Sequence, residues 1–220
     1  MNPVLTSTRG VTLFGGGEVR AEDAAMALAL APVAMAADSG ADAALGLGIV
    51  PAAVVGDFDS ITDAARAAIP ADRLHRVPDQ DSTDFDKCLM MLRAPFVLAV
   101  GFAGPRTDHL LAGLTTLIRH PVPRAFVIGA EDVIFVAPPV LGLDLLPGTR
   151  VSLMPFGAVE GHSTGLRWPI DGLTLTPATR IGTSNEATGP VRLQTTGPCL
   201  VILPKDQLRA ALDGCGILPD

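Results

Sequence analysis

The first 137 residues alternate short apolar runs with helical patterns, and this alternation constrains the fold more than any other feature of the chain. Six runs reach a Gly or an Asp at their ends: VTLFGGG, PVAMAADSG, PAAVVGDFDS, RLHRVPD, FVLAVGFAG and RAFVIGA. Helical patterns separate them, and the longest predicts one buried stripe through Leu110, Leu111, Leu114, Leu117 and Ile118. Strands that alternate with helices predict a parallel, Rossmann-like sheet that is covered on both faces.

The pattern changes after residue 137, where Pro138 and Pro139 stand. The runs LGLDLLPGTRVSLMPFG, GLRWPIDGLTLTP and PVRLQTTGPCLVILP are short, strand-like and separated by turn residues, and a helical pattern returns only in KDQLRAALD. Such spacing is typical of a small all-β module. We therefore expect an α/β protein with a parallel-sheet domain at 1–137 and a C-terminal β-sandwich domain at 138–220.

Charge and composition argue against several classes of binding partner. The 220 residues carry a formal net charge of -7, and no Lys/Arg cluster offers the basic patch that nucleic acid requires. The most apolar run, residues 24–37, is too short to span a bilayer and contains Pro32. The three cysteines show no metal-binding or disulfide pattern. We expect a soluble cytoplasmic protein with reduced thiols and without nucleic-acid or membrane partners.

Acidic residues follow four of the predicted strands or lie in the next loop. They are Asp38 in AADSGA, Asp57 and Asp59 in GDFDS, Asp79 and Asp81 in PDQDS, and Asp108 in GPRTDH. Open parallel sheets bind ligands where the strands deliver their carboxyl ends. The sequence therefore predicts an acidic site along one rim of the sheet.

The pair Asp57 and Asp59 is the most specific part of this rim. In an extended segment, residues i and i+2 point to the same side about 7 Å apart, so their carboxylates repel unless a cation lies between them. Hard oxygen ligands without His or Cys suit Mg2+, which also bridges to substrate phosphates. The alternative is a pair of solvated turn acids, with Asp59 or Ser60 capping the helix ITDAARAAI.

Two further segments add charge to the rim. In DSTDFDK, Ser82 or Thr83 can cap a helix, and Asp84 and Lys87 can both face the rim; the alternatives are dipole compensation and a solvated lysine. The loop GFAGPRTDH brings Gly104 and Arg106 to a helix start, where backbone amides and a guanidinium attract phosphate. The Gly15–Gly17 run offers a similar close approach, and His109 is expected on the helix surface or in packing.

These segments, in this order, resemble the thiamine pyrophosphokinase family. The matching text is ADSGA, GDFDS, DQDSTDFDKCL, GPRTDH, GLRWPI and TSNEATG, and the resemblance runs from about residue 11 to residue 203. It implies a homodimer of protomers with an α/β domain and a β-sandwich. It also implies transfer of a pyrophosphoryl group from ATP to the hydroxyl of thiamine, with AMP as the second product. Ser39 and Pro105 stand where the family often has glycine.

The resemblance also implies roles for individual residues. The acids that match positions engaging Mg2+ and the ATP phosphates are Asp57, Asp59 and Asp84. The catalytic set is completed by Arg106 and Asp108. The residues that match nucleotide- or thiamine-binding positions are Asp38, Lys87, Gly104, Trp168, Ser184 and Asn185, the last three commonly approaching thiamine near the dimer interface.

The sequence leaves two roles undecided. Either Asp84 or Asp108 could orient or deprotonate the attacking hydroxyl. Trp168, the only Trp of the chain, is either a stacking surface for the thiazolium cation or a core residue.

Other functions fit part of the sequence. In a haloacid-dehalogenase-like phosphatase, Asp57 would be the nucleophile and Asp59 the general acid, but that class prefers its DxD after the first strand and gives no role to DQDSTDFDK or GPRTDH. Sugar-nucleotide transferases with a metal-binding DxD meet the same objection. A thiamine or nucleotide sensor, and a pyrophosphokinase for another hydroxylated heterocycle such as a pterin alcohol, remain as alternatives.

Overall fold

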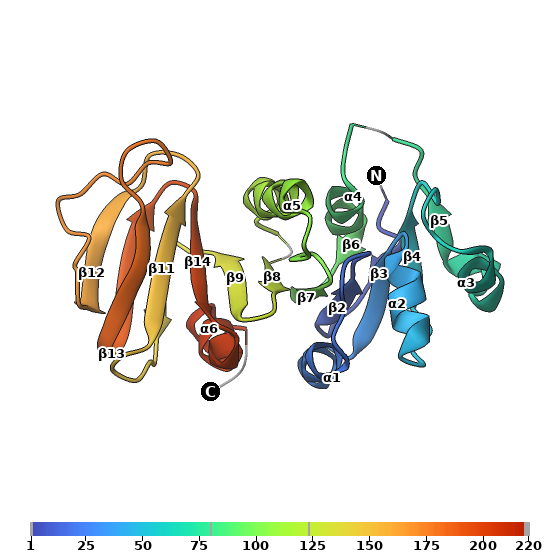
Figure 1. Ribbon diagram of the computed structural model, residues 1–220, viewed down its shortest axis with the longest axis horizontal. Helices are drawn as coiled ribbons and strands as arrows, with labels where there is room; N and C mark the ends of the chain where they lie inside the picture. Colours follow the sequence, from blue (N-terminus) through green and yellow to red (C-terminus); the bar gives the residue numbers. More distant parts are fainter. Residues whose placement is uncertain (1, 80, 123, 218–220) are drawn as a thin grey trace. The chain divides into compact units, whose positions relative to one another are not determined.

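The computed structural model describes residues 2–79, 81–122 and 124–217. It separates into two compact units, Met1–Gly129 and Ala130–Asp220 (Figure 1). The sequence predicted a boundary after residue 137, which lies one strand further along the chain than the boundary between these units. The strand concerned, β9 (Asp132–Val136), pairs antiparallel with β14 (Cys199–Pro204) and is therefore part of the second unit.

Parallel strands form the centre of the first unit. One ladder contains β2 (Val11–Phe14), β7 (Phe96–Val100) and β8 (Arg124–Ile128), and a second contains β3 (Val33–Ala37), β4 (Ala53–Gly56) and β5 (Leu74–Arg76). A short parallel pair joins β1 (Leu5–Thr6) to β6 (Leu92–Arg93). β2, β4 and β7 are buried along their whole length, because helices cover strands of this kind on both faces.

Helices connect these strands (Figure 1). They are α1 (Ala21–Leu30), α2 (Gly40–Gly46), α3 (Asp63–Ala68), α4 (Asp84–Met90) and α5 (Thr107–Arg119). The buried side of α5 is formed by Gly113, Thr116 and Leu117, and Leu111, expected in the stripe, is 56% exposed. The expected alternation of strands and helices is confirmed, and with it the α/β class of the fold.

The second unit is built from antiparallel strands. Besides β9 and β14 it contains β10 (Val140–Leu143), β11 (Arg150–Pro155), β12 (Glu160–Leu166) and the long β13 (Gly182–Thr196). The first part of β13 pairs with β11, and its later part pairs with β10 and β12. The helix expected near the C-terminal end of this unit is α6 (Leu208–Gly214). One strand therefore belongs to two groups of strands, and packing of these groups as a sandwich stays a prediction.

Two smaller expectations concern cysteines and the membrane. Cys88 and Cys199 are buried and Cys215 is partly exposed, and within the described residues none of them forms a disulfide. Within the part of the chain that is described, none of the helices has both the length and the apolar character that crossing a bilayer would need.

Candidate active site

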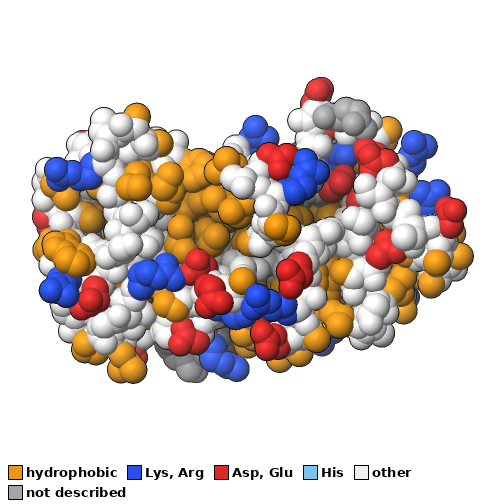
Figure 2. Space-filling view, in the orientation of Figure 1, with side chains coloured by type: hydrophobic (Ala, Val, Ile, Leu, Met, Phe, Trp, Pro, Cys, Tyr) orange, Lys and Arg blue, Asp and Glu red, His pale blue; other side chains and the backbone are white. Residues whose placement is uncertain are grey.

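A cavity of about 660 Å3 opens in the first unit, where loops follow the parallel strands. Its lining contains seven of the residues predicted from the sequence: Asp38, Asp57, Asp59, Asp84, Lys87, Gly104 and Arg106. They come from loops after β3, β4 and β7 and from the start of α4. Figure 2 shows acidic and basic side chains gathered over this part of the unit. The rim expected from the sequence is therefore a concave site with charges of both signs.

Three carboxylates converge at one end of this cavity. Oxygen atoms of Asp38, Asp57 and Asp59 all lie within 4.8 Å of one another. The extended conformation expected for the segment that carries this pair is wrong, because Phe58 has a φ of +66°. In this turn the backbone N–H of Asp59 donates to Oδ1 of Asp57 at 3.3 Å. The donor set consists of hard oxygen atoms and suits Mg2+.

Asp38 is the buried member of this group, with 3% of its surface exposed. Its carboxylate accepts hydrogen bonds from the backbone N–H of Ser60 at 3.4 Å and of Ile61 at 3.1 Å. Burial, the charge of Asp84, and a hydrogen bond and charge from Asp59 raise its pKa to about 6, against the opposing effect of the Ser60 N–H. A group of carboxylates that destabilise one another's charge is well suited to hold a cation.

Asp84 contacts a lysine. Thr83 caps α4, as one of the two alternatives predicted, and Asp84 is the first residue of the helix. Lys87 Nζ lies 3.0 Å from Oδ1 of Asp84, and only 3% of the lysine side chain is exposed. A solvated surface lysine is therefore ruled out. The structure groups Asp38, rather than Asp84, with Asp57 and Asp59.

The capping interpretation of the acid pair is wrong in its detail. Helix α3 begins at Asp63, and its cap is Thr62, which accepts a hydrogen bond from the N–H of Ala65. Asp59 instead accepts a hydrogen bond from the hydroxyl of Ser60 at 2.7 Å. The helix therefore does not use the carboxylate of Asp59, which remains part of the cavity lining.

A buried carboxylate that the sequence analysis missed supports the start of α4. Asp86 and Thr83 form a capping box, in which each side chain accepts a hydrogen bond from the other residue's backbone N–H. Asp86 Oδ1 also lies 3.1 Å from Nε2 of His120 and 3.7 Å from a guanidinium nitrogen of Arg119. The hydrogen bonds from Thr83, Thr116 and His120 lower its pKa even though burial opposes them. The Thr-x-x-Asp spacing is the signal that could have indicated this box.

Arg106 and Asp108 form an exposed ion pair. Arg106 donates to Oδ1 of Asp108 at 3.2 Å and to Oδ2 at 2.6 Å, and both side chains are 66% exposed. The guanidinium lowers the pKa of Asp108 to about 2. Arg106 belongs to the described lining of the cavity, and Asp108 lies outside it. Of these two predicted site residues, Arg106 lines the cavity and Asp108 lies beside it, bound to its guanidinium.

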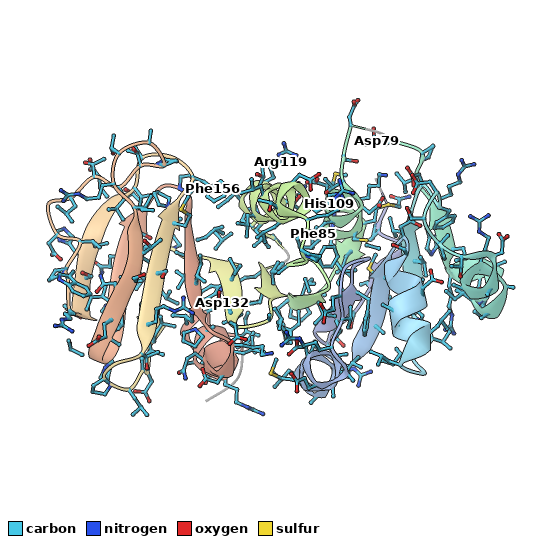
Figure 3. The ribbon with its side chains drawn as sticks, in the orientation of Figure 1. Asp79, Phe85, His109, Arg119, Asp132 and Phe156 are labelled. Carbon is cyan, nitrogen blue, oxygen red and sulfur yellow. The ribbon has the colours of Figure 1, made fainter. Side chains whose placement is uncertain are left out.

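Other lining residues were not predicted as part of the site. Phe85 and Phe102 stack with ring centroids 4.3 Å apart and form an apolar wall. Figure 3 labels Phe85 together with His109, which is exposed on α5, one of the two places expected for it, and also lines the cavity. Glu18 adds an acid that was not predicted, whereas Gly16 comes from the glycine run expected at the rim, and the hydroxyl of Ser39 occupies the space that a Cβ of Gly16 would need. Gln80 of the DQDS motif lies outside the described residues.

The predicted residues of the second unit form a separate arrangement. The backbone N–H of Trp168 donates to Oδ1 of Asn185 at 3.1 Å, and Nδ2 of Asn185 donates back to the Trp168 carbonyl at 2.7 Å. Asn185 is 6% exposed whereas Trp168 is 55% exposed, so Trp168 is not a core residue. The Arg167 guanidinium carbon lies 5.0 Å from the Trp168 ring centroid. Ser184, with a φ of +59°, donates its N–H to the Ser152 hydroxyl at 3.0 Å.

Two family models match the chain. The model described as "Thiamin pyrophosphokinase, catalytic domain" matches residues 25–127, and the model described as "Thiamin pyrophosphokinase, vitamin B1 binding domain" matches residues 143–200. A curated relative, thiamine pyrophosphokinase 1 from Oryza sativa subsp. japonica, is 27% identical over 151 residues, which are 60% of this chain and 57% of the relative. Thiamine pyrophosphokinase 1 from Arabidopsis thaliana is 29% identical over 123 residues, or 49% of this chain and 46% of the relative.

Solved structures of low sequence identity share the fold. Thiamin pyrophosphokinase from Candida albicans superimposes with a TM-score of 0.76 at 14% identity and covers 90% of this chain and 89% of its own. The Bacillus subtilis thiamine pyrophosphokinase gives a TM-score of 0.71 at 22% identity, over 89% of this chain and 98% of its own. The matched family models cover segments of both compact units. The chain belongs to the thiamine pyrophosphokinase family.

Proposed function

We propose that the protein is a thiamine pyrophosphokinase, which transfers a pyrophosphoryl group from ATP to the hydroxyl of thiamine. The observation that carries the proposal is the cavity of the first unit, in which acids, Lys87 and Arg106 from separate loops face one space. The thiamine oxygen attacks the β-phosphorus, the bond from that phosphorus to the α-phosphate oxygen breaks, and AMP leaves. The hydroxyl proton passes to a base.

Substrate positioning and electrostatic stabilisation account for most of the rate enhancement in such a transfer. Bound Mg2+ would neutralise phosphate charge, and the oxygen cluster of Asp38, Asp57 and Asp59 supports its binding, with Asp84 as the further ligand expected from the resemblance. Lys87 and Arg106 add positive charge for the phosphates of ATP. They come from separate elements, Lys87 from α4 and Arg106 from the start of α5, which supports contacts with more than one phosphate.

The base is more consistent with Asp84 than with Asp108. Asp84 lines the cavity, whereas Asp108 lies outside the described lining. The ion pair with Arg106 lowers the pKa of Asp108 to about 2, which makes it a weak proton acceptor. We therefore assign the orientation of the hydroxyl to Asp84 and the positioning of Arg106 to Asp108.

The second unit is proposed to bind thiamine through Trp168, Ser184 and Asn185. The exposed ring of Trp168 offers a π face to a cation, and the buried amide of Asn185 fixes the backbone that carries the ring. We propose that this unit packs as a β-sandwich and that the protein is a cytoplasmic homodimer with its thiamine site near the interface. These last points rest on the family resemblance.

The acid pair follows β4, not the first strand, so its place does not support a dehalogenase-like phosphatase. The deciding experiment incubates the protein with ATP, Mg2+ and thiamine and identifies the nucleotide product by mass. AMP together with thiamine diphosphate supports the proposal. ADP with thiamine monophosphate would mean attack at the γ-phosphorus, and the absence of a thiamine-dependent product would favour another acceptor, such as a pterin alcohol, or a sensor.

A further inference from the structure

The loop that carries the acid pair has a backbone shape that its sequence does not favour. Phe58, between Asp57 and Asp59, has a φ of +66°, a region that side chains with a Cβ disfavour and that bulky residues rarely adopt. Residues in such conformations persist only where the surrounding structure holds them. The structure must therefore supply contacts that keep this turn in place.

Two arginines from outside the cavity supply these contacts. Arg66 of α3 donates from Nη2 to the Phe58 carbonyl at 2.9 Å, and its guanidinium carbon lies 5.6 Å from the Phe58 ring centroid. Arg76, at the end of β5, donates from Nε to the Asp57 carbonyl at 3.1 Å. Both arginines lie outside the described lining of the cavity.

The two carbonyls belong to the peptide groups on either side of the Phe58 Cα. Because φ and ψ of Phe58 are rotations between these two planar groups, holding both carbonyls fixes both angles. The N–H of Asp59, which belongs to the second of these peptide groups, is held by Oδ1 of Asp57 at 3.3 Å. Arg66 and Arg76 thus fix the turn that brings the oxygens of Asp57 and Asp59 within 4.8 Å of those of Asp38.

We propose that Arg66 and Arg76 are positioning residues that hold the acidic loop in the shape that binds a divalent cation. The proposal rests on the cation site of the proposed function. A simple effect of charge would act in the opposite direction, because a guanidinium near the site repels a cation. Removing an arginine would then strengthen cation binding, whereas loss of the positioning contact weakens it, so the two roles differ in sign.

The test measures Mn2+ binding to the full chain by electron paramagnetic resonance of the free ion, without ATP or thiamine. Arg66→Gln and Arg76→Gln are each expected to weaken binding by about three- to tenfold, the effect of one lost hydrogen bond from a charged donor at an exposed position. Arg66→Lys keeps the charge but loses the planar fork, and it is expected to weaken binding as well. It also serves as the second variant if Arg66→Gln does not fold.

Arg73→Gln is the matched control. Arg73 also donates to a backbone carbonyl, that of Pro51 at 3.3 Å, but this carbonyl is not in the acidic loop. The control is expected to bind Mn2+ as the unchanged protein does. Unchanged or tighter binding in Arg66→Gln and Arg66→Lys would overturn the proposal.

A readout without metal separates this proposal from the proposed function. Amide hydrogen exchange at Asp59, Ser60 and Ile61 in the metal-free protein is expected to become faster in Arg66→Gln and to stay unchanged in Arg73→Gln. If the unchanged protein binds no Mn2+, the cation site of the proposed function fails, and the exchange rates still decide whether the arginines hold the loop. Equal exchange in Arg66→Gln and the unchanged protein would overturn the positioning role.

Discussion

The two compact units present their functional side chains by different means. In the first, acids from loops far apart in sequence meet at the ends of parallel strands, and burial together with the charges of Asp84 and Asp59 raises the pKa of Asp38 to about 6. In the second, Trp168 and Asn185 are joined by a reciprocal pair of hydrogen bonds between neighbouring segments. A site of the first kind depends on the balance of charge, and a site of the second kind depends on the geometry of a few contacts.

The strongest test of this comparison is Asp57→Asn, which removes one charge from the acid cluster and leaves the shape of the side chain. We expect Mg2+-dependent formation of AMP to fall by at least about 100-fold, because electrostatic stabilisation is the largest contribution to such a transfer. Steady-state rates over a range of Mg2+ concentrations measure the effect. Asp72→Asn, an exposed acid outside the described lining, is the control, and normal rates in Asp57→Asn would remove its proposed role.

The second test concerns the support beneath the first site. Asp86→Ala removes a buried carboxylate that accepts hydrogen bonds from Thr83 and His120, and we expect the free energy of unfolding to fall by about 1–3 kcal/mol. Urea unfolding followed by circular dichroism gives the value. Asp72→Ala serves as the exposed control. Equal stability of Asp86→Ala and the unchanged protein would show that the network does not stabilise α4.

The third test probes the second unit. Trp168→Ala is expected to raise the KM for thiamine by about 5- to 30-fold, equivalent to a cation–π contact of about 1–2 kcal/mol, and to change the KM for ATP little. Trp168→Phe keeps a π face and should lose less. Initial rates with each substrate varied in turn provide the measurement. An equal rise for both substrates would indicate that Trp168 supports the structure instead of binding thiamine.

The smallest expected effect is a pH dependence of the segment that follows Trp168, which contains Asp171. The hydrogen bond with His162 is the main cause that lowers the pKa of Asp171, and the hydrogen bond from the N–H of Ser163 adds to it. A lowered carboxyl pKa stabilises the fold above the unfolded value of about 3.9, and this contribution is lost as the pH falls through the folded pKa. We expect the fluorescence of Trp168 to change over that acidic range, and not in Asp171→Asn. The same change in both proteins would exclude Asp171 as its cause.

Local patterns allowed much of the fold to be predicted. Short apolar runs with glycine or aspartate at their ends became the parallel strands of the first unit, and two of the three turn-separated runs contain most of β10, all of β11 and β14, and the end of β13 in the second. The third run, GLRWPIDGLTLTP, was wrongly predicted to be strand-like, because only its first two residues belong to β12. The sequence left Ser82 and Thr83 as alternative caps of α4, because both carry a hydroxyl. The backbone angles of the folded chain select Thr83. Leu111 was wrongly assigned to the buried stripe of α5. The spacing of apolar residues shows which side of a helix is apolar, but not how much of that side the neighbouring elements cover.

The roles of the predicted site residues stay a prediction, but their places in the fold can be compared with it. Seven predicted residues line one cavity, because the ends of parallel strands deliver their loops to the same edge. The shape of the loop at Asp57 was predicted wrongly, since Phe58 has a positive φ and the arginines that contact this loop, Arg66 and Arg76, follow Phe58 by 8 and 18 residues and reach the loop only in the fold. Asp86 was missed because its partner His120 lies 34 residues away.

The sequence by itself determined the alternation of strands and helices in the first unit, the family, and most of the charged residues that line the cavity, because these follow from periodicity and from motifs of adjacent residues. Only the tertiary structure decided that Asp38 joins Asp57 and Asp59, that Lys87 is buried against Asp84, and that Asp108 lies outside the described lining of the cavity. The physical reason is that burial and electrostatic interaction depend on distances between atoms of separate segments. Those distances exist only once the chain has folded.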